Sequence, residues 1–214
     1  YGATIRHAFS SEDKKFGYKI NARYVEGTDF TLDDQEDADQ IAGFSNTIAY
    51  PDITPNGYVD ASSPGRQLLD INDLDDNNDG NPLATEYRNW SVNAHAEFRP
   101  NEKTSAFASA GVANGGALMF NSQEAGYQQG TDYWAQARVQ SGGLFGQVSY
   151  NYNDGGTDEN PTFLYASGFR QVAKRSSLEA QLQYNFDIPS FLNTNITVGG
   201  DYRDISSDSE QTLF

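Results

Sequence analysis

Hydrophobic and polar residues alternate one by one along several segments of this chain. In Phe16–Phe30, aromatic and aliphatic side chains take every second position at first, with Lys19, Asn21 and Arg23 between them. Successive side chains of a β-strand point to opposite faces, so the segment is predicted to be a ribbon with one apolar and one polar face. Tyr87–Arg99 shows the same alternation more cleanly than any other segment.

The alternation predicts eight strands. Their expected ranges are 1–10, 16–30, 87–99, 104–112, 132–140, 144–152, 177–186 and 194–203. Most have about nine to eleven residues, the length that a tilted transmembrane strand needs. The connections are expected to alternate between short and long, as they do between the periplasmic turns and extracellular loops of outer-membrane barrels. The sequence therefore predicts an all-β fold: an antiparallel transmembrane β-barrel wall with long extracellular loops.

Composition supports a wall more than a deep core. Hydrophobic residues make up 37% of the chain and the mean hydropathy is -0.68. These values suit a barrel wall with one water-facing side. The sequence has no apolar run of about 18 residues, so no transmembrane helix is predicted. The net charge of -16 argues against nucleic acid as a partner, because phosphate contacts need Lys and Arg. The absence of cysteine excludes disulfides and thiolate metal sites.

Several sequence blocks resemble a known family. These blocks are IRHAF, KKFGYKINARYVEGTDF, DYWAQARVQSGGLFGQVSYNYND and NPTFLYASGFRQVAKRSSLEAQLQYNF. They are similar, in this order, to the early barrel of TonB-dependent outer-membrane receptors of the Bacteroidetes type. That family's barrel has about 22 strands around a folded plug. The resemblance implies that residues 1–214 are one β-barrel segment, about eight strands of a larger barrel, with a long acidic loop at 31–86 and a polar tail at 204–214.

The resemblance also implies a function and partners. The family takes up metal chelates, vitamins, oligosaccharides or peptides across the outer membrane of Gram-negative bacteria. Expected partners are outer-membrane lipid, the rest of the barrel and its plug, and TonB, which the family contacts through an N-terminal region outside this chain. The sequence leaves open which nutrient is carried and whether a surface lipoprotein covers the loops.

The acidic loop contains a candidate calcium site. Residues 31–86 hold 13 of the 30 acidic residues and one basic residue, Arg66. Within them, LDDNNDGNPLATE matches the spacing of a calcium loop, in which alternate oxygens surround the cation and Gly80 permits the sharp turn. The predicted Ca²⁺ ligands are the side chains of Asp75, Asn77, Asp79 and Glu86 and the backbone carbonyl of Asn81. Pro82 and the lack of flanking helices depart from an EF-hand, and a solvated acidic loop is the alternative.

No catalytic site is predicted, so the chain is not expected to be an enzyme. His7 and His95 are far apart in sequence, and His95 alternates onto the polar face. The paired carboxylates Asp33 and Asp34 have no evident apolar pocket to raise a pKa. A group of basic side chains is expected to line the lumen, where ion pairs with Glu97 or Glu179 are the simplest role. These basic residues are Lys19, Arg23, Arg99 and Arg138.

Two other classes of protein fit the same pattern. One is a complete eight-stranded barrel with a structural or adhesive role in the outer membrane, since eight strands can close. The other is a secreted calcium-binding β protein, such as an adhesin or a carbohydrate-binding module.

Overall fold

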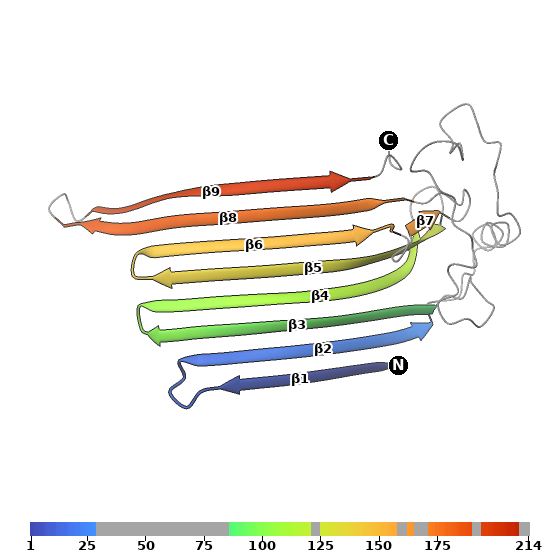
Figure 1. The fold of residues 1–214 in the computed structure, drawn as a ribbon, viewed down its shortest axis with the longest axis horizontal. Coiled ribbons are helices and arrows are strands. Elements are labelled where there is room, and N and C mark those ends of the chain that lie inside the picture. Colours follow the sequence, from blue (N-terminus) through green and yellow to red (C-terminus); the bar gives the residue numbers. More distant parts are fainter. Residues whose placement is uncertain (29–85, 121–124, 158–161, 165–170, 190–193, 210–214) are drawn as a thin grey trace, which may run out of the picture.

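The described part of the chain forms one antiparallel β-sheet (Figure 1). The computed structural model describes residues 1–28, 86–120, 125–157, 162–164, 171–189 and 194–209. The strands are β1 (Gly2–Ser10), β2 (Phe16–Thr28), β3 (Glu86–Asn101), β4 (Thr104–Phe120), β5 (Ala125–Ser141), β6 (Leu144–Gly155), β7 (Thr162–Leu164), β8 (Ala173–Ile188) and β9 (Thr194–Asp208). Their order in the sheet is β1-β2-β3-β4-β5-β6-β8-β9, and β7 pairs with β5 beside this path.

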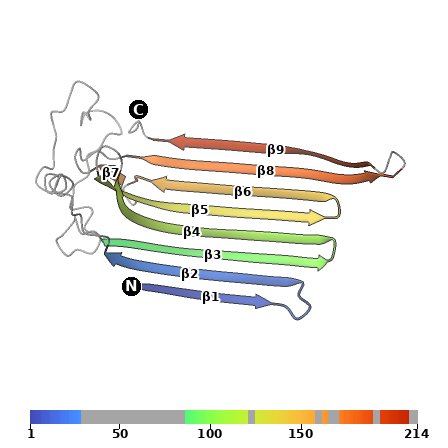
Figure 2. The ribbon, with the colours of Figure 1, turned by 180° about the vertical axis from the view of Figure 1, so that it is seen from behind.

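This architecture confirms the predicted all-β, antiparallel class. Each of the eight predicted strands forms, and each pairs with its neighbours in chain order. The sheet is open in the described residues, because β1 and β9 lie at its two edges. Figure 2 shows the same sheet from behind, again with β1 and β9 at opposite borders.

The expected connection between residues 113 and 131 is wrong. β4 continues to Phe120 and β5 begins at Ala125, and the two strands pair from Asn114 opposite Thr131 up to Phe120 opposite Ala125. The glycines here weaken the alternation of side chains, but they leave the backbone N–H and C=O groups free to pair. The sequence pattern therefore ended before the hydrogen-bonded ladder did.

Two further differences occur where alternation is absent. β7 has three residues, too few to show a period of two, and it pairs with the segment 126–128 of β5. β9 continues to Asp208, into the segment expected to be a polar tail. An edge strand exposed to water can be polar on both faces, so residues 204–208 have no alternation that would indicate a strand.

The hairpin between β1 and β2 is held by a hydrogen-bonded turn. Ser11 Oγ donates to Asp13 Oδ1 at 2.6 Å, and the Lys15 backbone N–H donates to the same oxygen at 3.1 Å. These hydrogen bonds, first that from Ser11, hold the pKa of the Asp13 carboxyl below its ordinary value. In the β5–β6 turn, Gly142 has a φ of 56°, a left-handed conformation that glycine adopts without strain.

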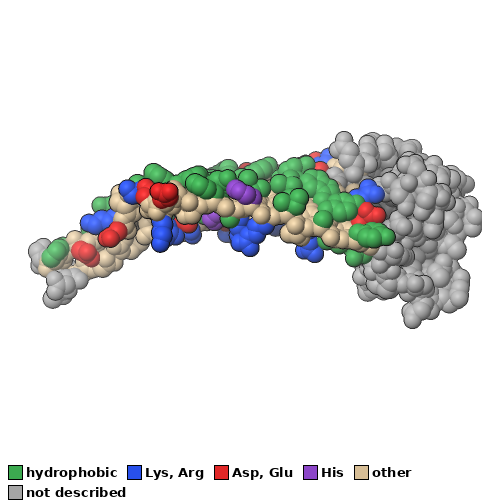
Figure 3. Space-filling model, turned by 90° about the horizontal axis from the view of Figure 1, so that it is seen from below, with side chains coloured by type: hydrophobic (Ala, Val, Ile, Leu, Met, Phe, Trp, Pro, Cys, Tyr) green, Lys and Arg blue, Asp and Glu red, His purple; other side chains and the backbone are tan. Residues whose placement is uncertain are grey.

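The sheet is a single layer with two unlike faces. Opposite residues of an antiparallel pair share a face. Hydrophobic side chains gather on one face in Figure 3 and Lys and Arg on the other. Among the described residues, one hydrophobic side chain is buried, that of Val172 at 1% exposure. Nothing described packs over the apolar face, so the sheet has no core of its own. The described residues contain no helix long and apolar enough to cross a membrane.

Candidate functional site

The apolar face is a continuous exposed surface. Its large side chains stay open to the outside, for example Ile5 at 73% and Leu182 at 60% exposure. With strands about 4.8 Å apart and an apolar stretch of about 27 Å along each, the surface measures roughly 900 Å². Soluble monomers rarely expose an apolar patch of more than a few hundred Å². This face therefore needs a cover of lipid or protein.

The apolar belt crosses the strands obliquely. On β2 it runs from Phe16 to Tyr24 and centres on Ile20. Following the paired residues from Ile20 across five strand spacings leads to Leu178 on β8. On β8, however, the apolar positions run over 178–188 and centre on Gln183, five residues further towards the turn. Averaged over the five spacings, this is one residue per strand, which corresponds to a tilt of about 35° between the strands and the direction straight across the belt.

Aromatic side chains mark both margins of this oblique belt. At the end of the sheet opposite the hairpin turns, called the loop end, the margin contains Tyr24, Trp90, Tyr133 and Tyr152. At the turn end, it contains Phe9, Phe16, Phe98 and Phe186. Once the slope of one residue per strand is included, the members of each group lie at nearly the same level. The belt is then about 22 Å high, measured straight across it from one margin to the other.

The polar side chains of the apolar face respect these margins, with one exception. Glu26, Arg88 and Asp204 lie on this face but beyond its loop-end margin. Among the described side chains between the margins, only His7 is strongly polar, and its ring lies 5.6 Å from that of Tyr18. The hairpin turns show the same slope, since their ends are staggered in one direction across the sheet in Figure 1.

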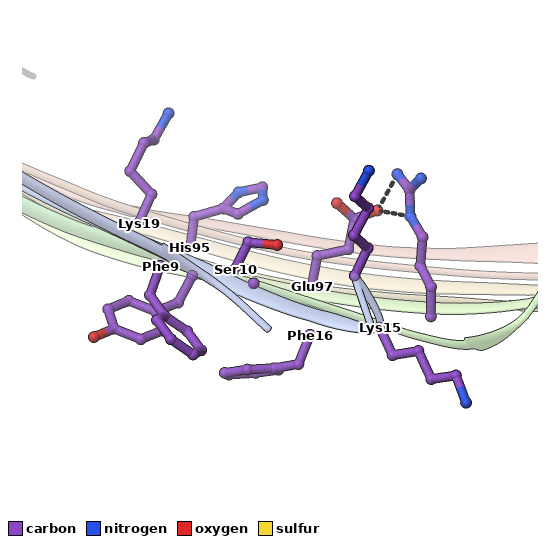
Figure 4. Close-up of a pocket in the computed structure, with 11 residues that line it drawn as sticks. Phe9, Ser10, Lys15, Phe16, Lys19, His95 and Glu97 are labelled. Atoms are coloured by element: carbon purple, nitrogen blue, oxygen red, sulfur yellow. Dashed lines mark hydrogen bonds and ion pairs between the residues drawn. The ribbon is translucent and has the colours of Figure 1, made fainter. Parts of the chain in front are cut away.

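The polar face carries charged and aromatic groups near the turn end (Figure 4). Lys19, His95 and Glu97 project to one side of the sheet there, while Phe9 and Phe16 project to the other. This confirms that His95 lies on the polar face.

Ring contacts and ion pairs link side chains on the polar face, both within β3 and between neighbouring strands. The ring of His95 meets that of Phe107 edge-on at 4.6 Å, and the Arg138 guanidinium lies 5.1 Å from the centre of the same ring. Arg99 Nε donates to Glu97 Oε1 at 2.7 Å. A second ion pair joins Arg203 Nε to Glu179 Oε1 at 2.9 Å.

The predicted basic residues lie where the alternation places them. Lys19, Arg23 and Arg138 are on the polar face, where they are in register with His95, Ser91 and Gln147. Of the two acidic partners proposed from the sequence, Glu97 pairs with Arg99, whereas Glu179 pairs with Arg203 of β9. The register explains this second pairing, because Glu179 and Arg203 are directly opposite each other.

The candidate calcium ligands fall almost entirely outside the described residues. Asp75, Asn77, Asp79 and Asn81 lie in the undescribed range 29–85. Glu86 is the first residue of β3, and its backbone pairs with Thr28. In the part of the chain that is described, no three His, Asp or Glu side chains are placed to hold a metal ion. Calcium binding therefore stays a prediction.

Sequence reasoning missed a groove on the polar face at the loop end of β2–β5. This loop-end groove has a volume of about 610 Å³, and its described lining residues belong to β2, β3, β4, β5 and β6. Its polar lining includes Arg23, Tyr87, Asn89, Ser91, Gln128 and Asp132. Gly115 and Gly130 could have indicated the groove, because they have no side chains to fill its floor. Glycines in a polar stretch, however, first indicate a loop.

No protein-family model, curated protein or solved structure matches this chain. What points to a function is therefore the geometry of the sheet: an oblique apolar belt on one face, and charged groups with a groove on the other.

Proposed function

We propose that this chain is part of the wall of a transmembrane β-barrel in the outer membrane of a Gram-negative bacterium, within a TonB-dependent nutrient receptor. The observation that carries the proposal is the oblique apolar belt with aromatic margins. Its tilt of about 35° and its height of about 22 Å are close to the 35–45° and roughly 25 Å of outer-membrane barrels. A soluble sheet covers its apolar face with a second layer, and the described residues supply none.

The open edges support a wall that belongs to a larger barrel. Unpaired backbone groups cannot lie in lipid, so β1 and β9 each need a neighbouring strand. In the described residues they do not pair with each other. The rest of a larger barrel supplies both neighbours, and this favours the receptor over a complete eight-stranded barrel.

The polar face then lines the lumen. Its Lys, Arg, His and Glu side chains would meet water, the plug and the passing nutrient, while lipid covers the opposite face. TonB and any surface lipoprotein would act at the plug and at the extracellular loops, away from the described sheet. The role of this segment is to form the wall and hold its loops over the entrance.

The acidic loop contributes a calcium staple in this proposal. Asp75, Asn77, Asp79, Asn81 and Glu86 would bind one Ca²⁺ and tie together a long loop that has no disulfide. Calorimetric titration with calcium checks this against Asp75→Ala. The parent should release binding heat that the variant lacks, and equal heats for both would reject the staple.

The proposed wall is tested by spin labels on alternate residues of β3. The chain has no cysteine, so single cysteines at Val92, Asn93, Ala94 and His95 can each carry one nitroxide. In lipid bilayers, labels at Val92 and Ala94 should collide with dissolved oxygen and be shielded from a water-soluble nickel chelate. Labels at Asn93 and His95 should show the opposite preference, because successive residues face opposite sides.

The same labels separate the proposal from a soluble β protein. A protein layer over the apolar face would shield Val92 and Ala94 from both oxygen and nickel. That result would reject a membrane wall. A label at Glu102 in the β3–β4 turn is the control and should meet the nickel chelate freely.

A further inference from the structure

The loop-end groove holds two opposite charges apart. Arg23 on β2 and Asp132 on β5 belong to one row of paired residues, with Ser91 and Ala113 between them. Three strand spacings separate their backbones by about 14 Å. Both side chains line the groove. Small residues between them leave the space over the floor open.

Neither charge is neutralised within the described residues. Arg23 makes no ion pair there. Asp132 Oδ1 accepts a hydrogen bond from Asn153 Nδ2 at 2.8 Å, so its other oxygen remains available. Elsewhere on this face, Glu97 and Glu179 are paired with arginines of the same or the next strand. Among the described residues, the groove thus has a cation and a carboxylate at opposite walls, neither of them in an ion pair.

The floor between the charges carries an amide. Asn89 lies across Gly115, where a β-carbon would come within 2.2 Å of Asn89 Oδ1. No side-chain hydrogen bond of Asn89 is made with another described residue. An amide side chain offers two donors and one acceptor oxygen, which is the complement of a peptide group. Gln128 and Tyr87 add polar atoms to the lining.

We propose that the loop-end groove binds short peptides of two to four residues with free termini. The peptide carboxylate pairs with Arg23, its ammonium group with Asp132, and an intervening peptide group hydrogen-bonds Asn89. An extended peptide of this size spans about 7–14 Å, which fits within the about 14 Å that separates the two backbones. This inference rests on the proposed function in taking the polar face as the nutrient side, and it names the nutrient class.

Other ligand classes fit the groove less well. A simple anion would meet Asp132, a simple cation would meet Arg23, and like charges repel. A neutral sugar would leave both charges without a partner while covering them, which costs free energy. A zwitterion with its charges far apart satisfies both walls at once.

Isothermal titration with trialanine tests the inference. The sample is the complete membrane protein containing this chain, solubilised in detergent. Trialanine should bind, and its N-acetylated, C-amidated form should bind at least about tenfold more weakly, because both charge-assisted contacts are lost. Arg23→Gln and Asp132→Asn should each weaken trialanine binding by at least about tenfold.

The controls use a matched pair of charges outside the groove. Arg138 and Asp201 also lie three strands apart in one row of the polar face. Arg138→Gln and Asp201→Asn should leave trialanine binding unchanged. Equal binding of the blocked peptide, or equal losses in the control variants, would overturn the inference.

The two proposals fail separately. If the β3 labels alternate as expected but trialanine does not bind, the peptide site is rejected and the wall stands. If trialanine binds with the stated charge dependence but the labels do not alternate, the groove stands and the membrane wall is rejected.

Discussion

Single glycines decide how closely two strands approach at the turn end of the sheet. At Gly143 a β-carbon would lie 1.9 Å from the backbone oxygen of Asn185. The same two residues share a hydrogen bond, from Asn185 N to Gly143 O at 2.8 Å. At Gly200, on β9, a β-carbon would meet nothing within 4 Å. The two glycines therefore have different reasons to be glycine.

Gly143→Ala is expected to destabilise the folded protein by about 1–3 kcal/mol, because the backbone of β8 must move away from the turn. Gly200→Ala is the matched control and should change stability by less than about 1 kcal/mol, since the added methyl meets no neighbour. Urea unfolding of the complete membrane protein that contains the chain, in detergent and followed by intrinsic fluorescence, measures both. Equal losses would show that the close approach at Gly143 is absent.

An aromatic side chain fills the space at another glycine. A β-carbon at Gly111 would lie 2.1 Å from Trp134 Cζ2, so the indole of β5 lies over the backbone of β4. This pairing follows from the register, because Gly111 is directly opposite Trp134. The residue types were visible in the sequence, but their contact depended on the strand pairing.

The apolar stretches of distant strands lie at different heights, although those of β2 and β3 are directly opposite each other. The stretch on β8 is displaced by five residues from the position that the pairing with β2 would give. A displacement of one residue per strand resembles an eight-stranded barrel of shear 8, whose strands tilt by about 36°. The slope is therefore a property of neighbouring strands together, and no single strand shows it.

Depth measurements on nitroxide labels should follow the oblique belt. Labels at Ile20, Ala137 and Leu182 are expected at nearly the same bilayer depth. A label at Leu178 should lie about 13 Å nearer the loop-end surface than one at Ile20, although the two share a row of paired residues. The ratio of oxygen to nickel accessibility reports depth. Equal depths at Ile20 and Leu178 would mean that the strands are not tilted in the membrane.

At the scale of the whole molecule, the described residues leave one apolar face and two strand edges uncovered. Lipid can cover the face, but it cannot hydrogen-bond the backbone of β1 and β9. In the proposed wall, further strands would therefore have to pair with these two edges.

Residues 1–214 alone are expected not to fold in detergent. Their gel mobility should then be the same with and without heating, because two open edges prevent a closed barrel. The complete membrane protein that contains the chain is the control and should show heat-dependent mobility. Heat-dependent mobility of the chain alone would favour a complete eight-stranded barrel in which β1 and β9 pair.

Much of this fold could be predicted because strand periodicity is a local property. In residues 87–99, residues two positions apart share a face, so the alternation assigns each residue to the apolar or the polar face. The strand, its two faces and the position of His95 on the polar face therefore needed no tertiary information. The same locality explains the failures. Glycines hid the ends of β4 and β5, three residues could not show β7, and the polar edge of β9 gave no contrast.

Residue order alone therefore settled the strands, their two faces and the antiparallel class, because these depend on contacts a few positions apart. Pairing between distant segments decided the rest. It set the slope of the belt, the open edges, the pairing of Glu179 with Arg203 and the groove between Arg23 and Asp132. These features need the register of several strands at once, and register is a relation between strands that no single strand encodes.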